Sequence, residues 1–199
     1  MTDRTIETAD ESLFVAVISS DFTEEGRKAG RWLLENYKAP GDVNIVELQG
    51  TVGSAPAIER KKGFEEVIKS DPRFKITRTQ TGDFSRAKGK EVMEAFLKAD
   101  SNINVLYAHN DDMAIGAMKQ LHDSGVATPD AVSVIGFDDV AIAPYIVPSL
   151  SSVRIPVTEM IQETISRLIF MLDGGEFKYQ QTFSGELVLR DSVIDGPHR

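Results

Sequence analysis

Two junctions in this sequence place acidic and amide side chains directly after an apolar run. Ile103–Ala108 ends at the tetrapeptide His109–Asp112, and Val132–Phe137 ends at Asp138 and Asp139. Such side chains can cap the helix that follows, coordinate Mg²⁺ through their oxygens, or hydrogen-bond a polar ligand. The choice depends on the elements that position the two junctions.

The composition limits the classes of protein to consider. The 199 residues are 41% hydrophobic, which suits one domain with a substantial core, and the formal net charge is -9. We expect no direct binding to nucleic acid, because phosphate contacts need a basic face. Cysteine is absent, which excludes disulfides, thiolate metal sites and a cysteine nucleophile. No apolar run reaches the roughly 18 residues of a membrane span, so no membrane partner is expected.

Short apolar runs recur along the chain and alternate with amphipathic segments. The runs are typical of strands in a parallel sheet: Leu13–Ile18, Val43–Leu48, Phe74–Thr79, Ile103–Ala108 and Val132–Phe137. The segments between them have apolar residues at helical spacing: Thr23–Tyr37, Ala57–Lys69, Ser85–Lys98 and Asp112–Ser124. This alternation predicts an α/β fold, a doubly wound parallel sheet in a flavodoxin-like, three-layer αβα lobe.

The C-terminal part of the sequence has a different pattern. Leu150–Ile155 is a short extended run, and Val157–Leu172 is expected to be a helix with a wide apolar face. Thr182–Leu189 is expected to be a final strand.

Ligands of doubly wound sheets bind beyond the carboxyl ends of the strands. The residues that follow the predicted strands are polar, acidic and include one aromatic ring: Ser19–Asp21, Gln49–Ser54, Thr81–Phe84, His109–Asp112 and Asp138–Asp139. We therefore expect a polar site at this edge of the sheet.

Two kinds of chemistry other than sugar binding are compatible with these residues. Gly50–Ser54 lies between a strand and a helix, as phosphate loops do, but it matches neither the P-loop nor the dinucleotide fingerprint. Asp21, Asp111 and Asp138 could hold Mg²⁺ in a hydrolase, although no lysine stands in a suitable partner position. The acids could also serve only to cap helices, and His109 to form a hydrogen bond at a strand end.

Binding of a neutral polyol fits the residue types better. Sugar hydroxyls both donate and accept hydrogen bonds, which suits carboxylates, amides and the planar fork of arginine. An aromatic ring can cover the apolar C–H face of a sugar. Arg60, Phe84, Asn110 and Asp138 supply these groups near separate strand ends.

Longer stretches resemble two related groups of proteins. "ELQGTVGSAPAIERKKGFEEVIK", "TGDFSRAKGKEVMEAFLKA" and "YAHNDDMAIGA" resemble galactofuranose-binding receptors of ABC transporters. "VSVIGFDDVAIAPYIVPSLSSVRIPVTEMIQ" and "FSGELVLRDSV" resemble lac-repressor-family transcription regulators, in particular repressors of aryl-β-glucoside operons. Both groups belong to the type I periplasmic-binding-protein superfamily. The mosaic suggests a chimera or an engineered single lobe, with one intermediate lineage as the alternative.

The resemblance implies roles for six residues. Arg60 matches the sugar-clamping arginine, Phe84 the stacking aromatic, Asn110 the amide of the Asn-Asp-x-Met-Ala motif, and Asp138 the acid after Gly-Phe.

Asp3 and Arg4 match a hinge Asp-Arg pair that binds sugar from the first lobe of these proteins. Ile155 stands where the family often has a glutamine, so an apolar side chain takes the place of that amide.

The resemblance also implies a single lobe. Residues 1–199 would correspond to the C-terminal-type lobe, with the first lobe and any DNA-binding headpiece absent. The apolar face of Val157–Leu172 would then lack the lobe on which it packs in the family. We therefore expect an exposed patch and a homo-oligomer formed through this helix. The start of the sequence lacks a secretion-signal pattern, which predicts a cytoplasmic protein, or a periplasmic one if its parent is a transport receptor.

The function expected from these observations is non-catalytic monosaccharide binding, without a cofactor or metal. Binding should be weak if only half of a cleft is present. The alternatives are a self-associating scaffold whose pocket is a relic, designed or inherited, and the Mg²⁺-dependent hydrolase. The sequence does not decide which sugar would bind.

Overall fold

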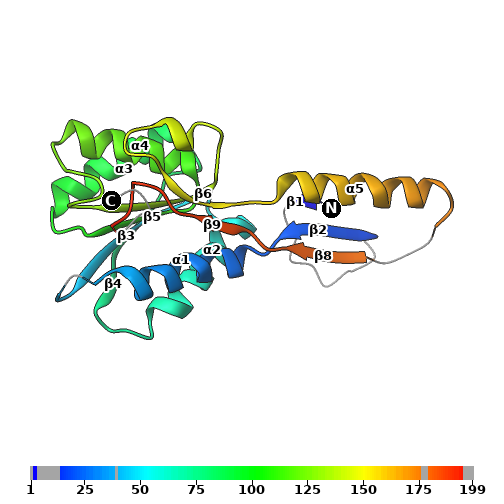
Figure 1. Ribbon diagram of the computed structural model, residues 1–199, viewed down its shortest axis with the longest axis horizontal. Coiled ribbons are helices and arrows are strands. Elements are labelled where there is room, and N and C mark those ends of the chain that lie inside the picture. The colour runs from blue at the N-terminus through cyan, green and yellow to red at the C-terminus, as the bar shows by residue number, and fades with distance from the viewer. Residues whose placement is uncertain (1, 4–13, 39, 176–178, 195–199) are drawn as a thin grey trace.

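A computed structural model describes residues 2–3, 14–38, 40–175 and 179–194 of the protein. These residues form a six-stranded sheet and a three-stranded sheet. Figure 1 shows an elongated molecule, with the larger sheet in a broad part and the smaller sheet in a narrow one. We call residues 21–155 and 184–194 the main body, and the remaining described residues the extension.

The main body contains the parallel sheet that the sequence predicts. Its strand order is β4-β3-β5-β6-β7-β9, in which β9 alone is antiparallel to its neighbour. The strands are β3 (Val43–Gln49), β4 (Phe74–Thr81), β5 (Val105–Ala108), β6 (Ser133–Asp138), β7 (Ser151–Arg154) and β9 (Glu186–Val188). The chain moves from β3 outward to β4 and then back across β3 to β5, so the direction of winding reverses there. Such a reversal is where the loops of a parallel sheet leave room for a ligand.

Helices cover both faces of the main sheet, which confirms the three-layer prediction (Figure 1). On one face, α1 (Phe22–Asn36) and α2 (Ala55–Ile68) pack over Ile45, Tyr107 and Ile135. On the other face, α3 (Arg86–Ala99) and α4 (Asp111–Asp123) pack over Val46, Leu106 and Val134. The central strands β3, β5 and β6 therefore contribute alternate side chains to two apolar cores, which explains their largely apolar sequences, whereas β4 at the edge is mostly exposed.

The extension is built from segments that are far apart in the sequence. Three parallel strands form its sheet in the order β1-β2-β8, and α5 contacts β2. The elements are β1 (Thr2–Asp3), β2 (Ala16–Ser20), β8 (Tyr179–Phe183) and α5 (Val157–Leu172). The chain passes between the extension and the main body at three places, namely from β2 to α1, from β7 to α5, and from β8 to β9 (Figure 1).

Two strand predictions were wrong in their placement. The first apolar run, Leu13–Ile18, was expected in the main sheet, but the strand is Ala16–Ser20 and it pairs with β1 and β8 instead. Thr182–Leu189 was expected as one strand, but it is divided at Ser184-Gly185 between the two sheets. Apolar pattern predicts that a segment is extended, whereas the sheet that it joins is decided by long-range pairing.

The α5 helix is the least buried of the long helices in the described chain. Its bounds agree with the prediction, and only Met160 is buried. Met171 is partly buried, and the other large apolar side chains are about half exposed or more: Val157, Ile161, Ile165, Leu168, Ile169, Phe170 and Leu172. The expected exposed apolar face is therefore present. Among the described helices, none has the length and apolar character needed to cross a membrane.

Glycines allow the helices of each pair to approach closely. A Cβ atom on Gly63 of α2 would lie 1.9 Å from the Thr23 carbonyl oxygen of α1, and one on Gly26 would lie 2.2 Å from the Arg60 carbonyl oxygen. These distances are far inside van der Waals contact, and the atoms met belong to the backbone. The separation of α1 and α2 is therefore set by residues without side chains.

We predict that Gly63→Ala forces α1 away from α2 and lowers the stability of the fold by about 1–3 kcal/mol, as overpacked sites do. Thermal melting followed by circular dichroism would measure the effect. Lys62→Ala, at the exposed neighbouring position of the same helix, is the control. Equal melting temperatures for the two variants would contradict the close contact.

Candidate functional site

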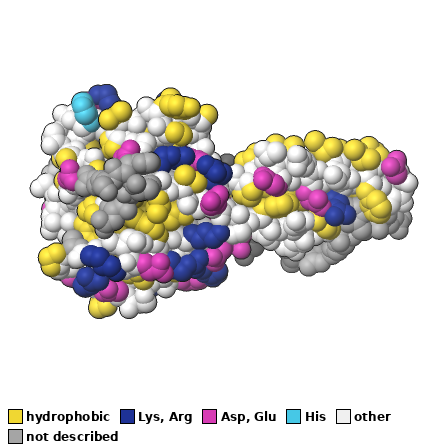
Figure 2. All heavy atoms as spheres, in the orientation of Figure 1, with side chains coloured by type: hydrophobic (Ala, Val, Ile, Leu, Met, Phe, Trp, Pro, Cys, Tyr) yellow, Lys and Arg dark blue, Asp and Glu magenta, His cyan; other side chains and the backbone are white. Residues whose placement is uncertain are grey.

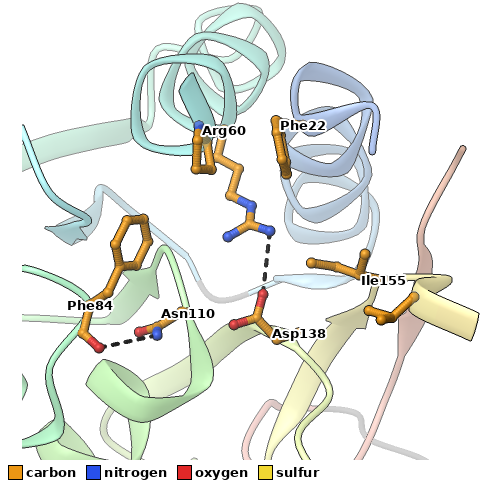
Figure 3. Close-up of a pocket in the computed structure, with 8 residues that line it drawn as sticks. Phe22, Arg60, Phe84, Asn110, Asp138 and Ile155 are labelled. Atoms are coloured by element: carbon orange, nitrogen blue, oxygen red, sulfur yellow. Dashed lines mark hydrogen bonds and ion pairs between the residues drawn. The ribbon is translucent and has the colours of Figure 1, made fainter. Parts of the chain in front are cut away.

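The carboxyl ends of the main-sheet strands border a hollow of about 330 Å³. Its lining comes from α1, α2, the loops after β4 and β5, the last residue of β6, the connection after β7 and the start of α5: Phe22, Pro56, Arg60, Phe84, Asn110, Asp138, Ile155 and Val157 (Figure 3). Four of the side chains that the sequence singled out, Arg60, Phe84, Asn110 and Asp138, thus lie around one hollow. Their contact with a ligand stays a prediction.

The two remaining predicted residues lie elsewhere or outside the described chain. Asp3 is in β1, where it pairs with Ser19 of β2 in the sheet of the extension. Arg4 lies outside the described residues. Ile155 lines the hollow with an apolar side chain.

Arg60 is held by acceptors from three elements. Its side chain is 3% exposed. Its Nε donates to Glu25 Oε2 at 3.0 Å, its Nη1 to the His109 carbonyl at 2.6 Å, and its Nη2 to Asp138 Oδ1 at 3.4 Å. The guanidinium also faces the ring of Phe22. A guanidinium has five N–H groups, so two directions remain beyond these three contacts. Figure 3 shows the group pointing from α2 toward Asp138.

Phe84 is fixed by its backbone and by a glycine. Asp83 and Phe84 both have positive φ, 52° and 54°, a conformation that costs a non-glycine residue about 1–3 kcal/mol. The half-buried ring lies over Gly50, where a Cβ atom would be 1.9 Å from it. The loop thus turns the ring across the end of β3. The glycine-rich stretch after β3 makes room for this aromatic ring.

Asn110 combines a structural role with its place in the hollow. It is the N-cap of α4, and its Oδ1 accepts a hydrogen bond from the Met113 backbone N–H at 3.0 Å. Its Nδ2 donates to the Phe84 carbonyl at 3.4 Å. The cap of this helix is therefore the amide, and not one of the two acids after it.

The two acids at the end of β6, Asp138 and Asp139, have different partners. Asp138 and Asp139 both have positive φ, 102° and 51°, which turns their side chains apart. Asp138 faces Arg60, whereas Asp139 pairs with Arg190 at 2.7 Å and with Arg154 at 2.8 Å. The strained turn therefore gives one carboxylate to the hollow and uses the other to tie β6 to the C-terminal segment.

A buried network fixes the rim beneath the hollow. His109 Nε2 lies 3.1 Å from Glu47 Oε1, and Lys61 and Thr79 each donate to Glu47 Oε2 at 2.8 Å. Burial alone would raise the pKa of Glu47, but its contacts with His109 and Lys61 lower it to about 2. Burial lowers the pKa of His109, so a neutral ring donates to an ionised carboxylate. His109 is thus a hydrogen-bonding residue at the end of β5, and its carbonyl is available to Arg60.

Phe22 and Glu25 are among the residues of this region that sequence reasoning missed. Phe22 lines the hollow and faces Arg60, yet the candidate segment after the first strand stopped at Asp21. Glu25 lies one turn into α1, fully buried against Arg60, and its helical spacing gave no sign of this role. Burial raises the pKa of the Glu25 carboxyl, and the Arg60 charge opposes that rise. Its pairing with Ser20 and Arg60 could be seen only in three dimensions.

The acids considered for a metal site are engaged in other contacts. Asp21 caps α1 by accepting from Glu24 N–H at 2.9 Å, and Asp111 is buried with a hydrogen bond from Ser152. In the described part of the chain, no three His, Cys, Asp or Glu side chains group as metal ligands would.

Comparison with known proteins decides the family. The profile described as "Periplasmic binding protein domain" matches residues 1–145, which is more than half of the chain. The chain belongs to this family. Among curated proteins, it is 52% identical over 155 residues to the HTH-type transcriptional regulator AscG of Escherichia coli, covering 77% of this chain and 46% of the regulator. It is 50% identical over 127 residues to the galactofuranose-binding protein YtfQ of the same organism, covering 62% of this chain and 40% of YtfQ.

Among solved structures, the chain is again similar to both a transcriptional repressor and a sugar-binding protein. The crystal structure of the Escherichia coli repressor ascG matches with a TM-score of 0.81 and 44% identity, over 97% of this chain and 68% of that one. A galactofuranose-binding protein matches with a TM-score of 0.86 and 36% identity, over 94% of this chain and 65% of that one. The mixed resemblance to receptors and repressors is confirmed. The chain spans less than half the length of these two curated relatives.

Asp111, at the start of α4, makes the stability of this periplasmic-binding-protein domain depend on pH. Burial raises the pKa of its carboxyl to about 7, against an opposing effect of hydrogen bonds from Ser152 and the Val140 backbone. The unfolded chain ionises this group near pH 4, so the free energy of unfolding falls as pH rises from about 4 to 7 and then levels.

We predict that Asp111→Asn removes this loss, because the amide does not ionise: its oxygen can accept from the Val140 N–H while its NH2 group donates to Ser152 Oγ. The gain in stability over wild type should grow from about pH 4 to pH 7, up to roughly 4 kcal/mol. Urea unfolding at a series of pH values would measure it, with Asp112→Asn as a control for net charge. If the free energies of unfolding of wild type and Asp111→Asn changed in parallel with pH, the pKa of the buried carboxyl would not be raised, and the prediction would be wrong.

Proposed function

We propose that this chain forms one wall of a cleft for a neutral monosaccharide and that it binds the sugar without catalysing a reaction. The observation that carries the proposal is the convergence of a guanidinium, an aromatic ring, an amide and a carboxylate on one hollow (Figure 3). The printed names of the relatives support it, because they include a galactofuranose-binding protein and ribose import binding proteins.

Each group has a suitable role toward a polyhydroxylated ring. Arg60 donates two further N–H groups in fixed directions, because Glu25 and the His109 carbonyl hold the guanidinium. Asp138 accepts from sugar hydroxyls beside Arg60, and the half-buried face of Phe84 covers apolar C–H groups. A hollow of about 330 Å³ is at the lower end of the range for small-molecule sites, which suits a monosaccharide.

The affinity of this wall alone is expected to be low. The hollow is bounded on the side of the extension by Ile155 and Val157, which offer a sugar no hydrogen bond through their side chains. Each sugar hydroxyl that loses water without gaining a partner costs about 1–3 kcal/mol. Dissociation constants on the order of 1 mM are therefore expected.

We predict that galactofuranose, galactose, ribose or a β-glucoside binds with a millimolar dissociation constant, measured by calorimetry at high ligand concentration. Arg60→Ala and Asp138→Ala should each weaken binding at least tenfold, because each removes a charged hydrogen-bond partner. Arg73→Ala, which removes an exposed arginine paired with Asp71, is the control.

Two other outcomes have definite meanings. If the ligand raises the melting temperature of both site variants as much as that of wild type, the hollow is a relic and the chain is a scaffold. Micromolar affinity would instead mean that a complete cleft exists, and the half-site proposal would be wrong.

We further propose that a second copy of the chain covers the exposed face of α5. Figure 2 shows hydrophobic side chains gathered along the extension. Ile161, Ile165, Leu168 and Leu172 recur at intervals of four, three and four residues and are all about half exposed or more. This is the spacing at which two helices pair along one seam. The seam therefore favours an identical helix as its partner.

A concentration-dependent dimer is expected in sedimentation velocity. Ile165→Glu should shift the equilibrium to the monomer by at least tenfold, because it places a charge in the apolar seam. Ser166→Glu introduces the same charge at an exposed position outside the seam and should leave the dimer intact. A wild-type protein that stays monomeric at high concentration would rule out this assembly.

A further inference from the structure

The positive charge of Arg60 is balanced by carboxylates of the protein itself, without a ligand. Two carboxylates, Glu25 and Asp138, contact this one guanidinium at 3.0 and 3.4 Å. They differ in exposure, because the Glu25 side chain is fully buried whereas that of Asp138 is 34% exposed in the hollow. Glu25 does not line the hollow, so it can affect a ligand only through Arg60.

The Glu25 carboxylate is fixed in place from its other side. Its Oε1 accepts a hydrogen bond from the Ser20 hydroxyl at the end of β2, and Ser20 is paired with Phe183 at the end of β8. A Cβ atom on Gly185 would lie only 3.3 Å from Glu25 Cγ, so the chain between β8 and β9 closes over the side chain. Glu25 is thus enclosed where two chain crossings meet, and it cannot turn away from Arg60.

The surroundings of the ion pair have a low polarity. The rings of Phe22 and Phe137 lie 5.1 and 4.7 Å from the Arg60 guanidinium carbon. Charges interact more strongly between such apolar walls than in water. Arg60 is also the only cationic side chain among the described residues that line the hollow. Its net charge toward a ligand therefore depends on the two carboxylates.

We propose that Glu25 determines which ligands the cleft accepts according to their charge. By neutralising Arg60 from the side away from the hollow, it restricts the cleft to uncharged sugars and excludes sugar acids and sugar phosphates. This inference rests on the sugar-binding function proposed above and adds a residue that sets its specificity. With Glu25 in place, the three charged groups sum to one negative charge, and an anionic ligand is repelled. Without it, Arg60 would have only Asp138 to balance it and could pair with a ligand carboxylate or phosphate.

The test compares matched neutral and anionic sugars. D-galactose and D-galacturonate differ only at C6, and ribose and ribose 5-phosphate form a second pair. Ligand-detected NMR titrations at pH 8, where Glu25 is more fully ionised, would give the dissociation constants of wild type, Glu25→Gln and Glu24→Gln. Glu24 lies beside Glu25 on α1 but pairs with Arg31 and Arg27 at the surface, so its variant has the same net charge.

Wild type and Glu24→Gln should both prefer the neutral sugar by about tenfold or more. In Glu25→Gln this preference should fall by about tenfold, mainly because the anion binds more tightly. The double variant Glu25→Gln/Arg60→Gln should lose the gain for the anion, since the unbalanced cation is removed. Circular dichroism would establish that each variant is folded.

A second variant covers the case in which Glu25→Gln does not fold. Asp138→Asn removes the other carboxylate from the same guanidinium at a partly exposed position, and its preference should shift in the same direction. An unchanged preference in the folded Glu25→Gln, or in Asp138→Asn if that is the only folded variant, would overturn the inference. An equal loss of both sugars in Glu25→Gln would also overturn it, because that result describes a structural role.

Failure of the proposed function would be seen separately. If wild type binds neither sugar of either pair, the binding function and the inference fall together. If wild type binds the neutral sugar and Glu25→Gln keeps the wild-type preference, only the role of Glu25 fails.

Discussion

The buried ion pair between Arg60 and Glu25 is the interaction on which the rest of the site depends. A guanidinium in this position would be very costly to bury alone, because each unpaired ion loses several kcal/mol of hydration. Glu25, the His109 carbonyl and two aromatic rings together make its burial possible. The same contacts give the group a single orientation. The directions in which the Arg60 N–H groups face the hollow are therefore set by contacts on the opposite side of the guanidinium.

The sheet supplies the remaining geometry. Parallel strands end at one edge, so the loops after β4 and β5 and the last residue of β6 bring Phe84, Asn110 and Asp138 together although they are far apart in the sequence. Local strain completes the arrangement, since both Phe84 and Asp138 have positive φ. The backbone energy lost in these turns is offset by contacts with Gly50 and Arg60, respectively. Side-chain direction at the edge thus depends on a few non-glycine residues in unusual conformations.

Much of the main body could be predicted from the sequence, and the reasons are local. Apolar runs and helical spacing predicted the strands β3 to β7 and all the long helices, including the bounds of α5. Residue types near the strand ends and the family resemblance predicted four of the eight side chains around the hollow, Arg60, Phe84, Asn110 and Asp138, whose contact with a ligand stays a prediction. The placement of β2 and the division of the last strand could not be predicted, because they depend on pairing between distant segments. Glu25 was missed for a similar reason, since one carboxylate on an amphipathic helix gives no sign of burial.

The chain crosses three times between the main body and the extension, and this has a consequence for the order in which the protein folds. In the extension, Ser20 lies beside Phe183, 163 residues away. This pairing must join segments from nearly opposite ends of the chain, whereas the pairs from β3 to β7 join strands that are adjacent or one strand apart in the sequence. A nascent chain can therefore complete most of the larger sheet during synthesis, but β2 must wait for the last part of the polypeptide to emerge. If synthesis stopped after β7, β2 would lack its partner β8, and the apolar residues of β2 could then aggregate.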